Sequence, residues 1–443
     1  MLDATRWVVL SAGLGHVLRL ASNLILTRLL VPEMFGLMAI ATTAGVILAM
    51  LSDIGLQQVV VHSKRGDDPT FLDTVWTIQV VRGFALWGGS VVVAAGLALA
   101  THWGLVSPHS TYGDPLLPWL IVATGIPIVI TGLSSTLPLT ATRSFQMRPI
   151  FMLRFVGQIF GLAVMIVLAW LTRSIWALVV GSFASSALSA VLSHRWMVGP
   201  RNRLHWDKPA AHEVFSYGKW LAVSSAVTVF ASNGDRLLLA AYASAKVLGL
   251  YSIALGLVSA LDAILSQLFS KVMLPAFSEV ARNNPKGVPA AYFRLRWRVD
   301  PIILVSSGLL FGGAHLLIGT LYDARYAEAG RMLQILSLGM IVSRYTLVQQ
   351  VYLALGQTRY FVPLNVTRLV ATFTLIPLGY HLAGFTGALI AIAARDVPMA
   401  LLTLYLNARH HLNNVRLELG TLIFWPIGFA LAKGAEWVAA ALH

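Results

Sequence analysis

The stretch that decides the fold covers residues 232–284 and reads SNGDRLLLAAYASAKVLGLYSIALGLVSALDAILSQLFSKVMLPAFSEVARNN. Two long apolar runs flank a short break at Ser244 to Lys246, and a basic, proline-containing segment follows the second run. Each run is about as long as the roughly 20 residues with which an α-helix crosses a bilayer. The stretch therefore predicts a hairpin of two membrane helices that returns to one face.

A shortened copy of this stretch lies near the start of the chain. Arg28–Leu30 matches Arg236–Leu238, and Gly36–Ala41 matches Gly249–Ala254. The copies lie nearly half the chain length apart. Such an interval predicts two homologous halves around a central site.

The composition indicates an integral membrane protein. Of 443 residues, 57% are hydrophobic and 11% are charged, whereas soluble domains carry about 25% charged residues. The net charge of +14 would suggest a nucleic-acid surface in a soluble protein. Here the basic residues lie in short segments between apolar runs, where they set the orientation in the membrane. The absence of cysteine excludes disulfides, thiol nucleophiles and cysteine-containing metal sites.

The apolar runs predict twelve membrane spans, six in each half of the chain. They lie near 7–30, 34–61, 75–100, 116–141, 150–171, 174–196, 214–242, 247–275, 301–321, 328–356, 360–382 and 384–407. A last apolar piece, 419–442, either forms an extra span or lies at the membrane interface, because Pro426, Lys433 and Glu436 interrupt it.

The basic residues predict a cytoplasmic N-terminus. In that orientation the inside loops hold Lys64, Arg65, Arg143, Arg148, Arg195, Arg201, Arg203, Lys208, Arg282, Lys286, Arg294, Arg296, Arg298, Arg359, Arg409 and Arg416. The clear basic residues of the outside loops are Arg173, Lys246, Arg325 and Arg331. This asymmetry follows the positive-inside rule.

The basic segment 198–212 predicts the linker between the halves, because it holds Pro200, Pro209 and several charges. The predicted organisation is a six-helix bundle at 1–200, a cytoplasmic linker at 201–212, a second bundle at 213–410 and a tail at 411–443. Equal numbers of spans on either side of a cytoplasmic linker make the halves parallel repeats.

Five arginines fall inside predicted spans: Arg19, Arg82, Arg344, Arg368 and Arg395. An arginine facing lipid near a helix centre costs about 2.5–3.5 kcal/mol. Arg82 and Arg368 lie near the cytoplasmic ends, and we expect their side chains either to reach the interface or to line a cationic, substrate-binding cavity. The other three lie deeper, and we expect them either to line a hydrated cationic cavity or to form structural ion pairs.

The carboxylates predicted inside the membrane are Asp53, Asp235, Asp262 and Asp396. Asp235 and Asp396 each adjoin an arginine in the sequence, but neighbouring side chains on a helix point about 100° apart. The arginines therefore predict a net positive interior. Such an interior suits an anionic group, and phosphate above all, because the guanidinium fork binds its oxygens in pairs. Asp262, Asp53 and Asp396 are candidates for ion coupling or for simple pairing with an arginine.

The sequence shows no set of residues typical of an active site. The histidines are scattered, and the His410–His411 pair lacks nearby carboxylates. No glycine-rich phosphate loop follows a strand. We therefore predict neither catalysis nor a bound metal or cofactor.

The chain resembles a known family in a series of ordered motifs. They are TRLL at 27–30, PEMFGL at 32–37, LSDIGL at 51–56, TVWTIQVVRG at 74–83, DRLLL at 235–239, LGLY at 248–251 and VMLPAFS at 272–278. Together they resemble the polysaccharide-transporter branch of the multidrug/oligosaccharidyl-lipid/polysaccharide flippase superfamily. The remaining third of the chain is similar to that family mainly in its pattern of spans.

The resemblance implies an all-α membrane protein in which two six-helix bundles form a V around a central cavity. It also implies a flippase of the bacterial cytoplasmic membrane. The substrate would be a polyprenyl-pyrophosphate-linked oligosaccharide for exopolysaccharide or O-antigen synthesis, moved from the cytoplasmic to the outer leaflet by alternating access. Expected partners are this lipid-linked glycan, membrane lipid, and polymerase or other polysaccharide-assembly proteins.

Two other functions remain open from the sequence. A cation-coupled drug exporter of the same superfamily typically has an acidic residue in its first helix, whereas this chain has Arg19 there. A membrane enzyme acting on lipid-linked sugars commonly has a large outer loop, whereas the longest clear outer connection here is 102–115.

Overall fold

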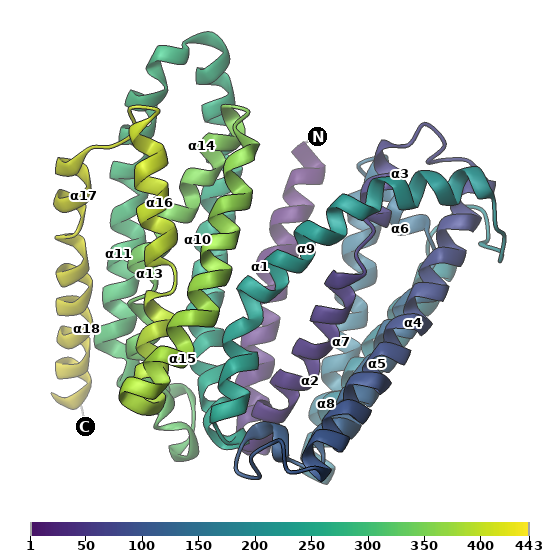
Figure 1. The fold of residues 1–443 in the computed structure, drawn as a ribbon, viewed down its shortest axis with the longest axis horizontal. Coiled ribbons are helices and arrows are strands. Elements are labelled where there is room, and N and C mark those ends of the chain that lie inside the picture. Colours follow the sequence, from purple (N-terminus) through teal and green to yellow (C-terminus); the bar gives the residue numbers. More distant parts are fainter. Residues whose placement is uncertain (1, 442–443) are drawn as a thin grey trace. The chain divides into compact units, whose positions relative to one another are not determined.

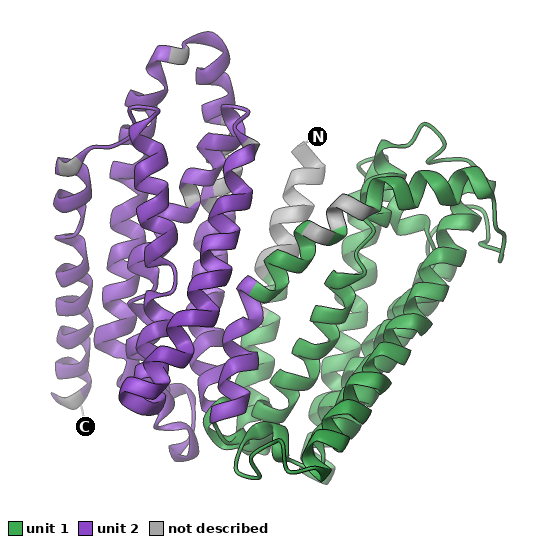
Figure 2. Cartoon of the chain, viewed as in Figure 1, with its two compact units in different colours: residues 1–230, 243–248 green, residues 231–242, 249–443 purple. Residues whose placement is uncertain are grey.

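The computed structural model describes residues 2–441 and consists of helices and loops, with no strand among these residues. Side-chain surroundings are described for these residues except 2–13, 16, 17, 219–221, 223, 268, 270–272, 274, 275, 285, 347, 358, 415 and 440. The chain divides into two compact units (Figure 2). Unit 1 holds residues 1–230 and 243–248, and unit 2 holds residues 231–242 and 249–443.

Unit 1 contains eight α-helices and the first part of a ninth (Figure 1). They are α1 (Leu2–Leu29), α2 (Pro32–Leu51), α3 (Leu56–His62), α4 (Pro69–His102), α5 (Leu117–Gly132), α6 (Leu137–Arg143), α7 (Met147–Thr172), α8 (Trp176–Arg195) and α9 (Lys208–Tyr242). Within the unit α4 packs on α5 and α7 packs on α8, while α5 also contacts α2 and α8.

Small residues allow these helices to approach closely. A Cβ atom on Gly161 of α7 would lie 2.7 Å from the carbonyl oxygen of Gly181 on α8 and 2.5 Å from the Cβ of Ser185. Only glycine leaves room for this contact, which is the close packing that helices use in lipid. The serine- and alanine-rich run 184–187 therefore lies where two backbones meet.

Unit 2 contains the end of α9 and the helices that follow it. They are α10 (Ala245–Asn283), α11 (Val288–Leu321), α12 (Ala329–Ser337), α13 (Met340–Ser343), α14 (Val348–Ala354), α15 (Phe361–Ala394), α16 (Val397–Ala408), α17 (Val415–Thr421) and α18 (Phe424–Ala441). A 3₁₀ turn, η4 (Arg344–Leu347), joins α13 to α14. Helix α11 packs on α12 and α18, and α15 packs on α12 and α16.

Each of the twelve predicted spans overlaps helical segments, but the span predicted at 328–356 is divided among α12, α13, η4 and α14. Among the described residues, eight helices are long and apolar enough to cross a membrane, or nine if the pair α5–α6, bent by 63°, counts as one span. The run Phe361–Ala408 is a single one of these candidates. It bends at Ala383 and Gly384, where Gly384 has φ 58°, so it contains the predicted spans 360–382 and 384–407.

The tail forms two helices. Residues 416–439 are apolar and long enough to be a candidate span, and α18 packs along α11 (Figure 1). The last residues of the predicted piece 419–442 lie outside the described residues.

The predicted linker is extended at residues 200–207 and lies against unit 1. The backbone N–H groups of Arg203 and His205 donate to Asp73 and Thr77 of α4. Asn202 accepts hydrogen bonds from the Ser135 hydroxyl and the backbone of Thr136. Helix α9 begins directly after this segment, at Lys208, and its last residues belong to unit 2.

Candidate functional site

A proline creates the turn that carries two of the predicted site residues. Pro398 at the start of α16 lacks an N–H and cannot continue α15, so the helix breaks at Arg395 and Asp396. The break places both charged residues side by side inside an apolar run. Discontinuous helices of this kind often hold the binding residues of transporters.

The structure brings four of the predicted residues together in unit 2, in what we call the Arg368–Arg395 group. Arg368 Nε of α15 lies 2.9 Å from Asp396 Oδ1. Arg395 Nη1 lies 3.4 Å from Asp235 Oδ2 of α9. Tyr251 of α10 donates a short hydrogen bond to the same Asp235 oxygen. Asp262 of α10 is attracted by Arg368 and repelled by Asp396.

The ion pairs in this group are incompletely hydrogen-bonded. Buried atoms without a hydrogen-bond partner include Asp235 Oδ1, Arg368 Nε, Arg395 Nη1 and Asp396 Oδ1. The Arg368 side chain is 26% exposed and that of Arg395 is 11% exposed. A buried polar group left unsatisfied costs about 1–3 kcal/mol. The group therefore has spare hydrogen-bonding capacity for a ligand.

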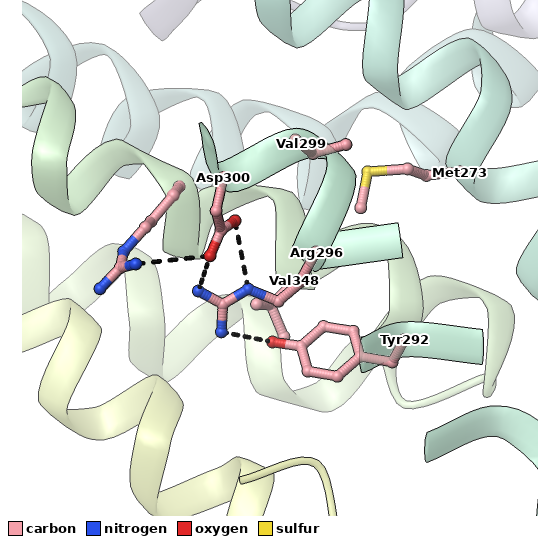
Figure 3. Close-up of a pocket in the computed structure, with 7 residues that line it drawn as sticks. Met273, Tyr292, Arg296, Val299, Asp300 and Val348 are labelled. Atoms are coloured by element: carbon pink, nitrogen blue, oxygen red, sulfur yellow. Dashed lines mark hydrogen bonds and ion pairs between the residues drawn. The ribbon is translucent and has the colours of Figure 1, made fainter. Parts of the chain in front are cut away.

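Arg344 lies in a second network, formed by Arg296 and Asp300 of α11, Arg344 of η4 and Glu418 of α17. Its Nη1 lies 3.4 Å from Asp300 Oδ2, and its Nη2 lies 3.3 Å from Glu418 Oε2. Arg296 pairs with both carboxylates, at 2.5 Å from Asp300 Oδ2 and in closer contact with Glu418 (Figure 3 shows Arg296, Asp300 and Tyr292). Two arginines thus face two carboxylates.

This second network is sealed. The Arg344 side chain is 4% exposed, and the gap that it lines with Tyr292, Val299 and Val348 is too narrow for a water molecule (Figure 3). Tyr345 donates to Glu418 Oε2 at 2.7 Å, and Arg344 donates to Thr421 at 2.9 Å. Of the two alternatives for Arg344, this surrounding is that of a structural ion pair.

Three members of this network, Arg296, Asp300 and Glu418, were not predicted from the sequence. Arg296 was assigned to an inside loop between Arg294 and Arg298, but it lies inside α11 and is buried. The usable signal was the spacing of Tyr292, Arg296 and Asp300, which places them on one helix face. Asp300 and Glu418 were not counted among the embedded acids, so the sequence overstated the positive charge of this half.

The remaining predicted residues, Arg19, Arg82 and Asp53, belong to unit 1. Arg19 is exposed on α1. Arg82 of α4 donates to the Ala49 carbonyl at 2.6 Å and to the Ser52 hydroxyl at 3.0 Å. It thereby caps the end of α2. Asp53 interacts with Arg82 and accepts a hydrogen bond from Gly55 in the turn that follows.

Charged residues also order the loop end of unit 1 near the linker. Arg65 donates to Asp68 and to Asp207 of the linker, at 2.9 and 3.0 Å. The hydrogen bond from Arg65 lowers the pKa of the Asp68 carboxyl below its ordinary value. The pair therefore stays ionised at neutral pH.

Among the residues whose side-chain surroundings are described, no three histidine, aspartate or glutamate side chains gather as they would around a metal ion. The polar interactions inside this apolar helical protein are ion pairs and hydrogen bonds.

These observations define the chain as an all-α integral membrane protein with the architecture of a transporter. A model of a family described as "Polysaccharide biosynthesis protein" matches residues 25–329. The chain therefore belongs to this polysaccharide biosynthesis protein family, which confirms the resemblance found in the motifs.

A curated relative is the succinoglycan biosynthesis transport protein ExoT of Rhizobium meliloti. It is 24% identical over 343 residues, which are 75% of this chain and 64% of that protein. The match thus spans less than two thirds of the relative's length.

Solved structures show the same fold. The lipid II flippase MurJ, in an inward closed conformation, matches with TM-score 0.65 and 11% identity over 100% of both chains. An inward-facing multidrug resistance transporter of the MATE family matches with TM-score 0.63 and 12% identity over 89% of this chain and 94% of that chain. The predicted all-α membrane fold of this superfamily is confirmed.

Proposed function

We propose that the protein is a flippase for a polyprenyl-pyrophosphate-linked oligosaccharide in the bacterial cytoplasmic membrane. The observation that carries this proposal is the family match over residues 25–329. Two relatives support it by their names, a succinoglycan biosynthesis transport protein and a lipid II flippase. The first name describes transport in the biosynthesis of a polysaccharide, and the second describes a flippase for a lipid.

The Arg368–Arg395 group is the part of the described structure that we assign to the substrate's diphosphate. Both arginines are held by single carboxylates in pairs with unsatisfied atoms. A diphosphate carries more negative charge than a carboxylate and offers several oxygens to a guanidinium fork. It would therefore compete with Asp235 and Asp396 for the arginines. Alternating access would then carry the head group across, while the prenyl tail stays in the bilayer.

Arg19 and Arg82 remain further candidates for contact with the substrate, and Asp262, Asp53 and Asp396 for coupling. The orientation that we propose has a cytoplasmic N-terminus, because the basic loops of the sequence require it. Polymerase and other assembly proteins are the expected partners.

The test of the arginine assignment is glycan export by variants in the native cell. Arg368→Gln and Arg395→Gln should reduce export severely, whereas Arg368→Lys should reduce it partially, because lysine keeps the charge and loses the fork. Arg331→Ala, an exposed arginine of the same unit, is the matched control and should export normally.

A double variant separates substrate binding from simple pairing. If Arg368 serves only to neutralise Asp396, the variant Arg368→Gln with Asp396→Asn should export normally, because no charge is left unpaired. If Arg368 binds the diphosphate, the double variant should stay defective at normal protein abundance. Normal export by the double variant would contradict the assignment.

A further inference from the structure

An open pocket lies at the loop end of unit 1, whereas both arginine networks belong to unit 2. Its volume is about 390 Å³, within the range of about 300–1,000 Å³ that is usual for ligand sites. It is formed by the α3–α4 turn, α6, the α6–α7 turn and the end of α8. In the orientation proposed above, these segments face the cytoplasm, where the substrate is loaded.

Polar groups of several kinds line this pocket. Asp67 is 74% exposed and is oriented by Arg143, whose Nε lies 3.1 Å from Asp67 Oδ2. The hydroxyls of Thr140 and Ser144 donate to backbone carbonyls of α6, at 2.9 and 3.0 Å. Their oxygens can still accept hydrogen bonds. Gln146 adds an amide with both a donor and an acceptor.

An aromatic side chain completes the lining. Trp196 follows the last turn of α8 and is 54% exposed. An indole face offers an apolar surface, and its N–H offers a donor. A sugar ring has the matching pair of features, namely an apolar C–H face and a rim of hydroxyls.

The backbone next to the pocket is held in an unfavourable conformation. Phe145, between Ser144 and Gln146, has φ 57°, although it is not a glycine. This left-handed conformation costs about 1–2 kcal/mol. It is fixed by the Gln146 N–H donating to the Ala141 carbonyl at 2.8 Å. Such strain is retained where the surrounding structure needs a turn to aim its side chains, and here the turn supplies Ser144 and Gln146 to the pocket.

The charge of the lining selects a neutral ligand. Asp67 is the one ionisable group among the residues that line the pocket, and its ion pair with Arg143 leaves no net charge there to attract a phosphate. The carboxylate would instead accept hydrogen bonds from hydroxyls. We propose that this pocket binds a sugar unit of the transported glycan before translocation. That the sugar belongs to a lipid-linked glycan rests on the proposed function, whereas the chemistry of the pocket does not.

The experiment is saturation-transfer NMR of soluble disaccharides with the full chain in nanodiscs, which avoids sugar-headed detergents. The probes are cellobiose, lactose and maltose. We expect saturation transfer from the wild-type protein to at least one probe. Trp196→Ala and Gln146→Ala should each weaken binding about fivefold to tenfold, from the lost stacking surface or hydrogen bonds. Trp170→Ala removes a similarly exposed indole of α7 outside the pocket and should bind as the wild type.

The outcomes separate this inference from the flippase proposal. Transfer to none of the three probes, or transfer unchanged in Trp196→Ala and Gln146→Ala, would overturn the sugar site. A loss with Trp196→Ala but not with Gln146→Ala would also overturn it, because that pattern describes an interfacial tryptophan. Sugar binding by a protein that moves no lipid-linked glycan would instead leave the pocket in place and remove the proposed function.

Discussion

Arg344 and Arg368 are both arginines within unit 2, but their surroundings differ. Arg344 shares two carboxylates with Arg296 and donates to Thr421. Arg368 forms one ion pair, with Asp396, and the Nε of each of the two arginines lacks a hydrogen-bond partner. A network of several ion pairs stabilises one arrangement of the helices, whereas a single pair can exchange its partner. We therefore expect variants of the two arginines to fail in different ways.

Removing Arg344 should destabilise the protein. Arg344→Met leaves Arg296 with two carboxylates, and breaking a buried pair typically costs about 3–5 kcal/mol. We expect lower abundance and a lower melting temperature of the purified protein, measured by tryptophan fluorescence on heating. The charge-balanced variant Arg344→Met with Glu418→Gln should regain much of the loss, because the new glutamine amide can still accept from Tyr345. A stable Arg344→Met protein that fails only in export would instead assign Arg344 to the substrate.

The different surroundings of Arg344 and Arg368 could not be predicted from the sequence. The apolar runs showed that both are embedded, since that depends only on local composition. Their ion-pair partners are Asp300 and Glu418 for Arg344 and Asp396 for Arg368, and contacts over such separations depend on packing. Asp300 and Glu418 fell outside the predicted spans because the hydropathy pattern locates a bilayer-sized core and not the end of a helix.

Helix α11 shows, at the scale of an element, that hydropathy does not locate the ends of a helix. Its span was predicted at 301–321, whereas the helix begins at Val288. At 1.5 Å per residue, its 34 residues give a length of roughly 50 Å, well beyond a hydrocarbon core of about 30 Å. A search for apolar runs therefore does not detect the polar first part of the helix. By contrast, the helix breaks at Pro398 and Gly384 can be predicted from the local sequence.

Helix α18 is attached to α11 through glycines. A Cβ atom on Gly428 would lie 2.2 Å from the Val305 carbonyl oxygen, and one on Gly308 would lie 2.3 Å from that of Trp425. The two backbones are therefore in direct contact. Because α17 directly precedes α18, this packing also helps to hold Glu418 of α17 in the network with Arg344.

Gly428→Leu should separate the two helices, because the nearest neighbours of the new side chain are backbone atoms of Val305. We expect the melting temperature to fall as it does in Arg344→Met, and the two changes together to be less than additive, since both loosen the tail. Gly434→Leu is the control on the same helix, since a Cβ there meets nothing within 4 Å. Equal melting temperatures for the two leucine variants would show that α18 does not depend on this contact.

At the scale of the whole molecule, the internal repeat predicted two related halves around a central site, and the resemblance of the motifs implied a transporter. The family match and the fold of solved transporters confirm the transporter class. The Arg368–Arg395 group gives unit 2 a site with unsatisfied hydrogen-bonding atoms, and the pocket beside Trp196 gives unit 1 a polar site of sugar-binding chemistry. A lipid-linked glycan has a diphosphate for the first and sugars for the second.

The measurement that tests the central claim most directly is translocation in proteoliposomes. Vesicles would contain the purified protein and a polyprenyl-pyrophosphate oligosaccharide in both leaflets, and an impermeant glycosidase would digest the glycan exposed outside. We predict that the wild-type protein makes the inner-leaflet share accessible over time, and that vesicles with Arg368→Gln, or with a fluorescent phospholipid in place of the glycolipid, behave like protein-free vesicles. Digestion that stops at the outer-leaflet share, with wild-type protein correctly inserted, would contradict the claim that this protein is a flippase for lipid-linked glycans.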